Sequence, residues 1–154
     1  MACRLHRSSN LDFNSLFWYD YYKLEINKSM SDKKIKVLLV EDDSMIVQMY
    51  KTRMENEGWE ILTTDRGSEA IKLAKTEKPN IVLLDIILPE IDGFTILKEL
   101  KVEATTKKIP VLMLTNLGQA SDQNKGQEIG ADGYFIKSQH TPADVIVKIK
   151  SLTK

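Results

Sequence analysis

The sequence has little of what marks disulfide-rich, membrane-spanning and nucleic-acid-binding proteins. It contains one cysteine among 154 residues, which excludes a disulfide within the chain and fits a reducing, cytoplasmic setting. No apolar run approaches the roughly 18 residues that suggest a membrane span. The 22 basic residues are balanced by 22 acidic ones, so no charge excess attracts nucleic acid or a membrane surface. We expect a cytoplasmic protein that acts on neither.

Residues 1–29 differ in composition from the remainder of the chain. Five of the eleven aromatic residues fall within residues 17–22, where Asp20 interrupts them and no apolar signal-peptide core follows. These aromatic side chains could anchor a docking segment to a partner. We favour a poorly ordered N-terminal extension instead, because the sequence from residue 30 onward looks like a natural protein start. The expected folded domain spans residues 33–154, and the 42% apolar content of the chain suffices for one core.

Short apolar segments alternate with amphipathic ones throughout this domain. Residues 81–84 are all apolar and two of them are β-branched, which indicates a strand buried on both faces, as in parallel sheets covered by helices. Residues 59–64 alternate more, which places that strand near an edge. The expected strands are 35–40, 59–64, 81–84, 111–114 and 134–136. A helical pattern follows each of them, so we predict an α/β fold with a five-stranded parallel sheet, right-handed crossovers and helices on both faces.

Capping residues and glycines mark the ends of the expected helices. Asp43 or Ser44 can cap the first helix. The apolar face of that helix is expected to consist of Ile46, Met49, Tyr50 and Met54. Gly93 opens the third helix, and residues 141–144 supply an N-cap, a proline at the first helical position and an acidic third residue for the last one. Residues 118–130 are polar, so a helix there would have poor propensity and marginal packing.

Polar residues stand where the first, third, fourth and fifth expected strands end. They are Glu41 and Asp42, Asp85, Thr115, and Lys137. Because the carboxyl ends of parallel strands meet at one edge of a sheet, we expect these side chains to share a small pocket. Carboxylates so close together resist ionisation unless a cation lies among them. An oxygen-only cluster with few ligands and room for water suits Mg²⁺.

Each of these residues also has an ordinary structural explanation. A single aspartate at a strand end is usually a turn or cap residue, and a single lysine there is usually solvated. The acidic pair could cap its helix, and Thr115 could be a β-branched strand residue. Their joint occurrence favours chemistry, because together they provide the metal ligands, nucleophile, hydroxyl and cation that a phosphoryl group requires.

Taken together, these residues resemble the receiver domains of two-component response regulators. The matching segments are Val40-Glu41-Asp42-Asp43, Leu84-Asp85, Leu88-Pro89-Glu90-Ile91-Asp92-Gly93-Phe94, Leu114-Thr115 and Gly130-Ala131-Asp132-Gly133-Tyr134-Phe135-Ile136-Lys137. The resemblance runs from about Lys33 to Lys154, in the order and spacing of the family. It implies a doubly wound, CheY-like and flavodoxin-like sheet with strand order 2-1-3-4-5.

The resemblance also implies a magnesium-dependent phosphoacceptor site. Asp85 would take a phosphoryl group from a histidine kinase or a phosphotransfer protein. Asp42 and Asp85 would ligate Mg²⁺ directly, Glu41 would act through water, and the backbone carbonyl of Ile87 would complete the protein ligands. Such a domain is not an enzyme beyond its own phosphorylation and autodephosphorylation.

Three further residues would bind or report the phosphoryl group. Thr115 would hydrogen-bond the phosphoryl oxygens, and Lys137 would pair with them as a compact charge. Tyr134 would change rotamer as Thr115 moves, or else it is an ordinary edge-strand aromatic. Because residues 119–129 adjoin Thr115 and have poor helix propensity, we expect them to form the output face with the fifth strand and the last helix.

The sequence departs from the family pattern at four positions. Ser138 follows Lys137 where proline is usual, and we expect a trans peptide bond or a rearranged turn there because a cis bond before serine would cost about 3 kcal/mol. Asn116 replaces a small residue, which would narrow access for small phosphodonors. Ile87 and Leu117 are both apolar, which would hinder attack of water on the acyl phosphate, so we expect a slowly decaying phosphorylated form.

Three hypotheses follow. The first is a stand-alone response regulator that signals to an unknown downstream protein, since Lys154 comes directly after the last helix. The second is a receiver-fold interaction module that is not phosphorylated, which Ser138 and Asn116 would permit. The third, a flavodoxin-like nucleotide or cofactor enzyme, is disfavoured because acidic residues, not a glycine-rich phosphate loop, follow the first strand.

Overall fold

A five-stranded parallel sheet lies at the centre of the domain. The computed structural model describes residues 34–153, and the expected extension at residues 1–29 lies outside this range. The strands and helices are β1 (Lys36–Val40), α2 (Ser44–Asn56), β2 (Glu60–Thr64), α3 (Gly67–Glu77), β3 (Ile81–Leu84), α4 (Gly93–Val102), β4 (Val111–Thr115), α5 (Ala120–Ile129), β5 (Gly133–Ile136) and α6 (Pro142–Leu152). The strand order is β2-β1-β3-β4-β5, which confirms the predicted fold class and the edge position of the second strand.

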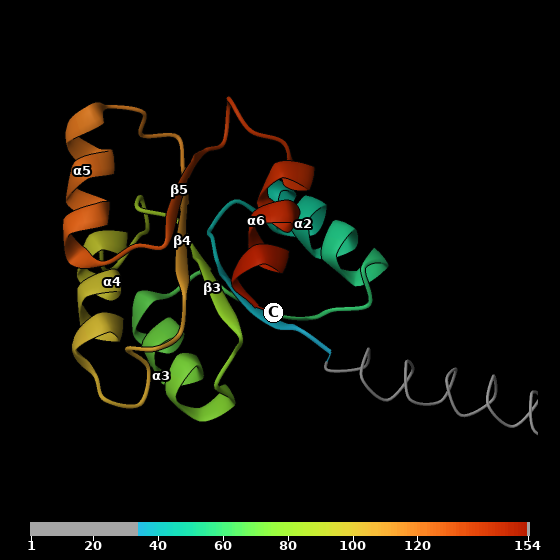
Figure 1. The fold of residues 1–154 in the computed structure, drawn as a ribbon, viewed down its shortest axis with the longest axis horizontal. Coiled ribbons are helices and arrows are strands. Elements are labelled where there is room, and N and C mark those ends of the chain that lie inside the picture. Colours follow the sequence, from blue (N-terminus) through green and yellow to red (C-terminus); the bar gives the residue numbers. More distant parts are fainter. Residues whose placement is uncertain (1–33, 154) are drawn as a thin grey trace, which may run out of the picture. The chain divides into compact units, whose positions relative to one another are not determined.

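Helices cover both faces of the sheet. Figure 1 shows α2 and α6 on one face, and α3, α4 and α5 on the other. Successive side chains of a strand point to opposite faces, so each all-apolar strand contributes to two cores. Leu38 and Val82 belong to the core beneath α3 and α4, whereas Leu39 and Leu83 belong to the core beneath α2 and α6. This double burial explains why the central strands read as continuous apolar runs.

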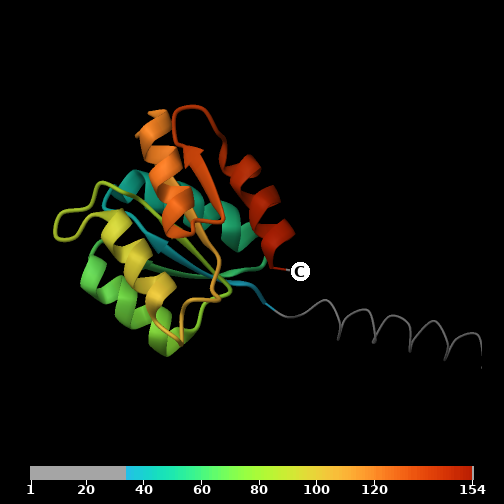
Figure 2. The same ribbon diagram turned by 60° about the vertical axis from the view of Figure 1, so that its left-hand side comes forward.

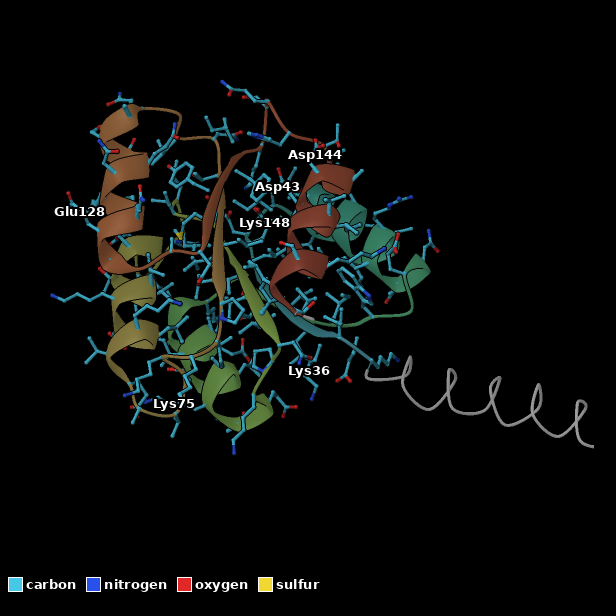
Figure 3. The ribbon with its side chains drawn as sticks, in the orientation of Figure 1. Lys36, Asp43, Lys75, Glu128, Asp144 and Lys148 are labelled. Carbon is cyan, nitrogen blue, oxygen red and sulfur yellow. The ribbon has the colours of Figure 1, made fainter. Side chains whose placement is uncertain are left out.

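The helix caps are largely those that the sequence indicates. Asp43 caps α2, since its Oδ1 accepts from the backbone N–H of Met45 at 2.8 Å. Thr141 and Asp144 form a reciprocal capping box at the start of α6, as predicted. Figure 3 shows Asp43 and Asp144 at the N-terminal ends of α2 and α6, on the same side of the sheet. Both helices therefore begin at the edge where the strands end.

The local pattern was wrong for one residue of α2 and right for α5. Met49 is 43% exposed, so its predicted place on the apolar face of α2 is wrong. The sheet contacts the side of α2 that carries Tyr50 and Met54, and Met49 lies away from that line. Residues Ala120–Ile129 do form a helix, but Gly126 is the only buried residue that α5 contributes within the described chain. The expected marginal packing of this segment is confirmed.

None of the helices among residues 34–153 is long and apolar enough to cross a membrane.

Candidate functional site

Strand register brings the carboxylates of the first and third strands together. Val40 of β1 is paired with Leu84 of β3, so the next residues, Glu41 and Asp85, stand at equivalent positions on neighbouring strands. The ladder continues one residue beyond the strands, because the N–H of Asp85 donates to the carbonyl of Val40 at 3.0 Å. The two carboxylates are thus held by main-chain hydrogen bonds at the sheet edge, where strand-end ligands are expected.

The acidic residues at this edge form one cluster. Glu41, Asp42 and Asp85 each offer a carboxylate oxygen, and these oxygens lie within 4.8 Å of one another. Glu41 and Asp85 are only 2% and 6% exposed, whereas Asp42 is exposed to solvent. Hard oxygen donors that are partly buried and partly open to water are suited to a divalent cation such as Mg²⁺.

Lys137 connects the two buried carboxylates. Its Nζ lies 2.6 Å from Oδ2 of Asp85 and forms a second ion pair with Oε2 of Glu41. Burial lowers the pKa of Lys137, but its hydrogen bond to Asp85 and its attraction to the negative charges of Asp85 and Glu41 outweigh burial, so the pKa is raised. The ammonium therefore stays protonated at neutral pH. β5 lies two strands away from β3, which carries Asp85 at its end. The long side chain of Lys137 is needed to cross this distance from the end of β5.

Glu41 remains incompletely satisfied by these contacts. Burial raises the pKa of Glu41 above its ordinary value, although Lys137 acts in the opposite direction. Within residues 34–153, its Oε2 is the one buried side-chain oxygen that lacks a hydrogen-bond partner, and its contact is the ion pair with Lys137. An under-satisfied buried carboxylate oxygen beside two other carboxylates is an arrangement that a cation would complete.

Asp85 is oriented by contacts to both of its oxygens. Oδ1 accepts from the N–H of Ile86 at 2.6 Å and from that of Ile87 at 3.3 Å, while Oδ2 accepts from Lys137. Gly93, the first residue of α4, presses against the same turn: a Cβ there would lie 2.1 Å from the carbonyl oxygen of Asp85. The sequence analysis assigned Gly93 only to a helix start. Its contact with Asp85 depends on how the β3–α4 loop folds back.

Thr115 and Tyr134 meet at the loop after β4. Thr115 is fully buried, and its hydroxyl accepts from the N–H of Leu117 at 3.4 Å. The Tyr134 hydroxyl donates to the carbonyl of Leu117 at 2.9 Å, and its ring lies next to Gly126 of α5. Burial, together with the negative charges of Asp122 and Asp85, raises the pKa of Tyr134 to about 12, so its hydroxyl remains a donor. The loop thus joins the β4 strand end to α5.

An open hollow of about 450 Å³ surrounds the cluster. Its lining consists of Glu41, Asp42, Asp43, Ile46, Asp85, Ile87, Asn116, Lys137 and Ser138. Three of the four positions that depart from the family pattern therefore border the site. Residues 34–153 contain no cis peptide bond, which confirms the trans bond expected before Ser138. Lys137 reaches Asp85 with that trans bond in place.

Comparisons with known proteins agree with this geometry. The model of the response regulator receiver domain family matches residues 37–150. A probable transcriptional regulator ycf27 of Porphyra purpurea is 35% identical over 125 residues, which are 81% of this chain and 50% of that protein. The chain spans about half the length of the curated relatives it matches.

Solved structures are similar as well. A putative response regulator from Chloroflexus aurantiacus has a TM-score of 0.74 and 30% identity, covering 79% of this chain and 98% of the other. The receiver domain of a sensor histidine kinase from Pseudomonas aeruginosa, solved with a magnesium ion in its active site cleft, has a TM-score of 0.71. It is 20% identical and covers 78% of this chain and 98% of the other, a likeness of fold.

Proposed function

The chain belongs to the family of response regulator receiver domains, whose model covers residues 37–150, and on that premise we propose that it is phosphorylated on Asp85. The observation that carries the proposal is the convergence of Glu41, Asp42 and Asp85 with the ammonium of Lys137 at one sheet edge. The donor is a phosphohistidine of a histidine kinase or of a phosphotransfer protein. The domain thus acts as a two-component signalling switch.

The residues present fit a magnesium ion. Asp42 and Asp85 would hold it directly, Glu41 would act through water, and the carbonyl of Ile87 would add a further oxygen. The ion supplies charge neutralisation to the transferring phosphoryl group. The under-satisfied oxygen of Glu41 supports this assignment. The single positive charge of Lys137 is divided between the buried carboxylates of Glu41 and Asp85, so a further cation would be needed to balance both.

Phosphoryl transfer places the greatest demand on the position of Asp85. A carboxylate oxygen of Asp85 forms a bond to phosphorus while the bond from phosphorus to the donor nitrogen breaks, and the leaving imidazole keeps the electron pair. A carboxylate is a weak nucleophile, so rate comes from in-line positioning and from neutralising charge. The N–H groups of Ile86 and Ile87 orient Asp85, and Lys137 provides the protein's own positive charge.

The phosphoryl group would then act through Thr115. Its hydroxyl now accepts from Leu117, and it would turn toward the phosphoryl oxygens as a donor. Tyr134 shares Leu117 as a partner and abuts Gly126, so a change at Thr115 would reach α5. We propose that α5, β5 and α6, which lie side by side in Figure 2, form the output face for a downstream protein.

The second candidate is a receiver-fold interaction module that is not phosphorylated. It is favoured by Asn116, which lines the hollow where the family has a smaller residue, and by Ser138, which lines it in place of the usual proline. The contact between Lys137 and Asp85 favours the first candidate. The two differ in whether the protein acquires an acyl phosphate when it is incubated with acetyl phosphate and Mg²⁺, and this incubation is the test of the proposed function.

Removal of the metal is expected to prevent phosphorylation. Chelation by EDTA should stop phosphoryl uptake. Asp42→Asn removes a proposed direct ligand, so it should slow uptake by more than the roughly ten- to hundredfold typical of losing a residue that only supports a metal ligand. Asp65→Asn is the matched control, because Asp65 is also an exposed aspartate at a strand end but lies outside the carboxylate cluster. Intact mass after incubation with acetyl phosphate measures uptake. Equal rates in the two variants would contradict a metal role for Asp42.

The phosphorylated form is expected to decay slowly. Ile87 is 58% exposed at the rim of the hollow, and an apolar side chain there cannot orient a water molecule for attack. Ile87→Gln should therefore shorten the lifetime of the acyl phosphate by about tenfold, whereas Val102→Gln, at an apolar position on α4 that is 74% exposed, should leave it unchanged. Decay is followed by intact mass after removal of the donor. A wild-type lifetime of only seconds would argue against this reading.

A further inference from the structure

The end of β5 is held on its outer side by a histidine. Within residues 34–153, β5 is an edge strand paired with β4 alone, so alternate N–H groups of β5 face away from the sheet. On the inner side, the N–H of Lys137 donates to the carbonyl of Thr115 at 2.8 Å. On the outer side, the N–H of Ile136 lies 3.2 Å from Nδ1 of His140. The imidazole takes the place of a neighbouring strand.

The hydrogen-bond network assigns the tautomer of His140. The carbonyl of Ile136 already accepts from the N–H groups of Gln139 at 2.9 Å and His140 at 3.1 Å, which occupies both of its lone pairs. Nδ1 lies 3.2 Å from both the N–H and the carbonyl oxygen of Ile136. Because that carbonyl is already engaged twice, we assign Nδ1 as the acceptor of the Ile136 N–H, which places the ring proton on Nε2.

The ring itself is fixed by packing. His140 contacts Phe135 edge-to-face, with ring centroids 5.1 Å apart and an interplanar angle of 84°. Phe135 packs against the core beneath α2 and α6. An aromatic pair in this arrangement restricts both rings, so the acceptor nitrogen is held at a defined position relative to the strand end.

These contacts bear directly on Lys137. Lys137 is the residue directly after Ile136. Its ammonium reaches both Asp85 and Glu41 from the edge strand of the sheet. A strand end clamped on one side only would leave the direction of the next side chain less defined. We propose that His140 is a positioning residue that sets the reach of Lys137 into the site. This inference rests on the proposed phosphoryl transfer to Asp85.

The test compares two substitutions of His140 in the full chain. Asn places its Oδ1 where His has Nδ1, so His140→Asn keeps the acceptor, whereas His140→Leu keeps side-chain bulk without it. We expect His140→Leu to speed hydrogen exchange of the Ile136 amide and to slow phosphoryl uptake from acetyl phosphate on the order of tenfold to a hundredfold. His140→Asn should restore both to within about threefold of wild type. In the wild-type protein, ¹⁵N NMR should find the Nε2–H tautomer.

The outcomes separate this inference from the proposed function. If His140→Leu takes up phosphoryl groups as fast as wild type, the positioning role is overturned. A failure of His140→Asn to rescue uptake would overturn it as well. Protonated Nδ1 in the NMR spectrum would also overturn it. If wild-type protein takes up no phosphoryl group, the proposed function fails. A crystal structure of His140→Leu then decides the positioning role by whether Nζ of Lys137 still lies within hydrogen-bond distance of Asp85.

Discussion

Replacing Asp85 by asparagine is expected to abolish phosphoryl uptake. The amide keeps the shape of the side chain, and its oxygen can still accept from the N–H groups of Ile86 and Ile87. It has no anionic oxygen to form an acyl phosphate, and it loses one carboxylate of the proposed metal cluster. Asp85 is also one of the two partners of Lys137, so the substitution removes nucleophile and charge pair together.

The matched control for this substitution lies in the same loop. Asp92→Asn makes the same chemical change, but Asp92 caps α4 by accepting from the N–H groups of Phe94 and Thr95, and asparagine is an equally good cap. Intact mass after incubation with acetyl phosphate and Mg²⁺ should show the phosphoryl adduct for wild type and Asp92→Asn, and none for Asp85→Asn. Circular dichroism checks that all three proteins are folded. Adduct formation by Asp85→Asn to the wild-type extent would exclude Asp85 as the acceptor.

Gly93→Ala is expected to be the most destabilising of the single-methyl changes in the site. A Cβ at Gly93 would lie 2.1 Å from the carbonyl oxygen of Asp85 and 2.7 Å from Cα of Ile86. Both are backbone atoms of the turn that carries the phosphoacceptor, so no side-chain rotation can relieve the clash. We expect the free energy of unfolding to fall by about 3 kcal/mol, the upper end of overpacking costs. Phosphoryl uptake should fall with it, because the turn orients Asp85.

Gly126→Ala adds the same methyl group where there is room for it. Its Cβ would meet the Tyr134 ring at 3.4 Å, an ordinary contact, and alanine in a helix interior is favoured over glycine by about 1 kcal/mol. This variant should therefore be as stable as wild type or more so. Urea unfolding followed by circular dichroism measures both proteins. Equal midpoints for the two variants would contradict the close approach of Gly93 to the Asp85 turn.

Local sequence patterns were enough to predict the elements and their approximate ends. Continuous apolar runs such as residues 81–84 can be buried only between two layers of helices, and the alternation at residues 59–64 correctly predicted the edge position of β2. The capping box at Thr141 was equally local, because its hydrogen bonds join residues within one turn. Such features depend on side-chain chemistry a few positions apart. They need no knowledge of the rest of the fold.

Contacts that depend on strand register and on loops folding back arise only in the folded chain. Pairing of Val40 with Leu84 makes Glu41 the in-register neighbour of Asp85, and the length of Lys137 lets it bridge the two. The contact of Gly93 with the Asp85 turn joins a helix start to a strand end. These approaches come from hydrogen bonding between distant segments, which no local pattern encodes, and they set how the strand-end residues named by the sequence can act together.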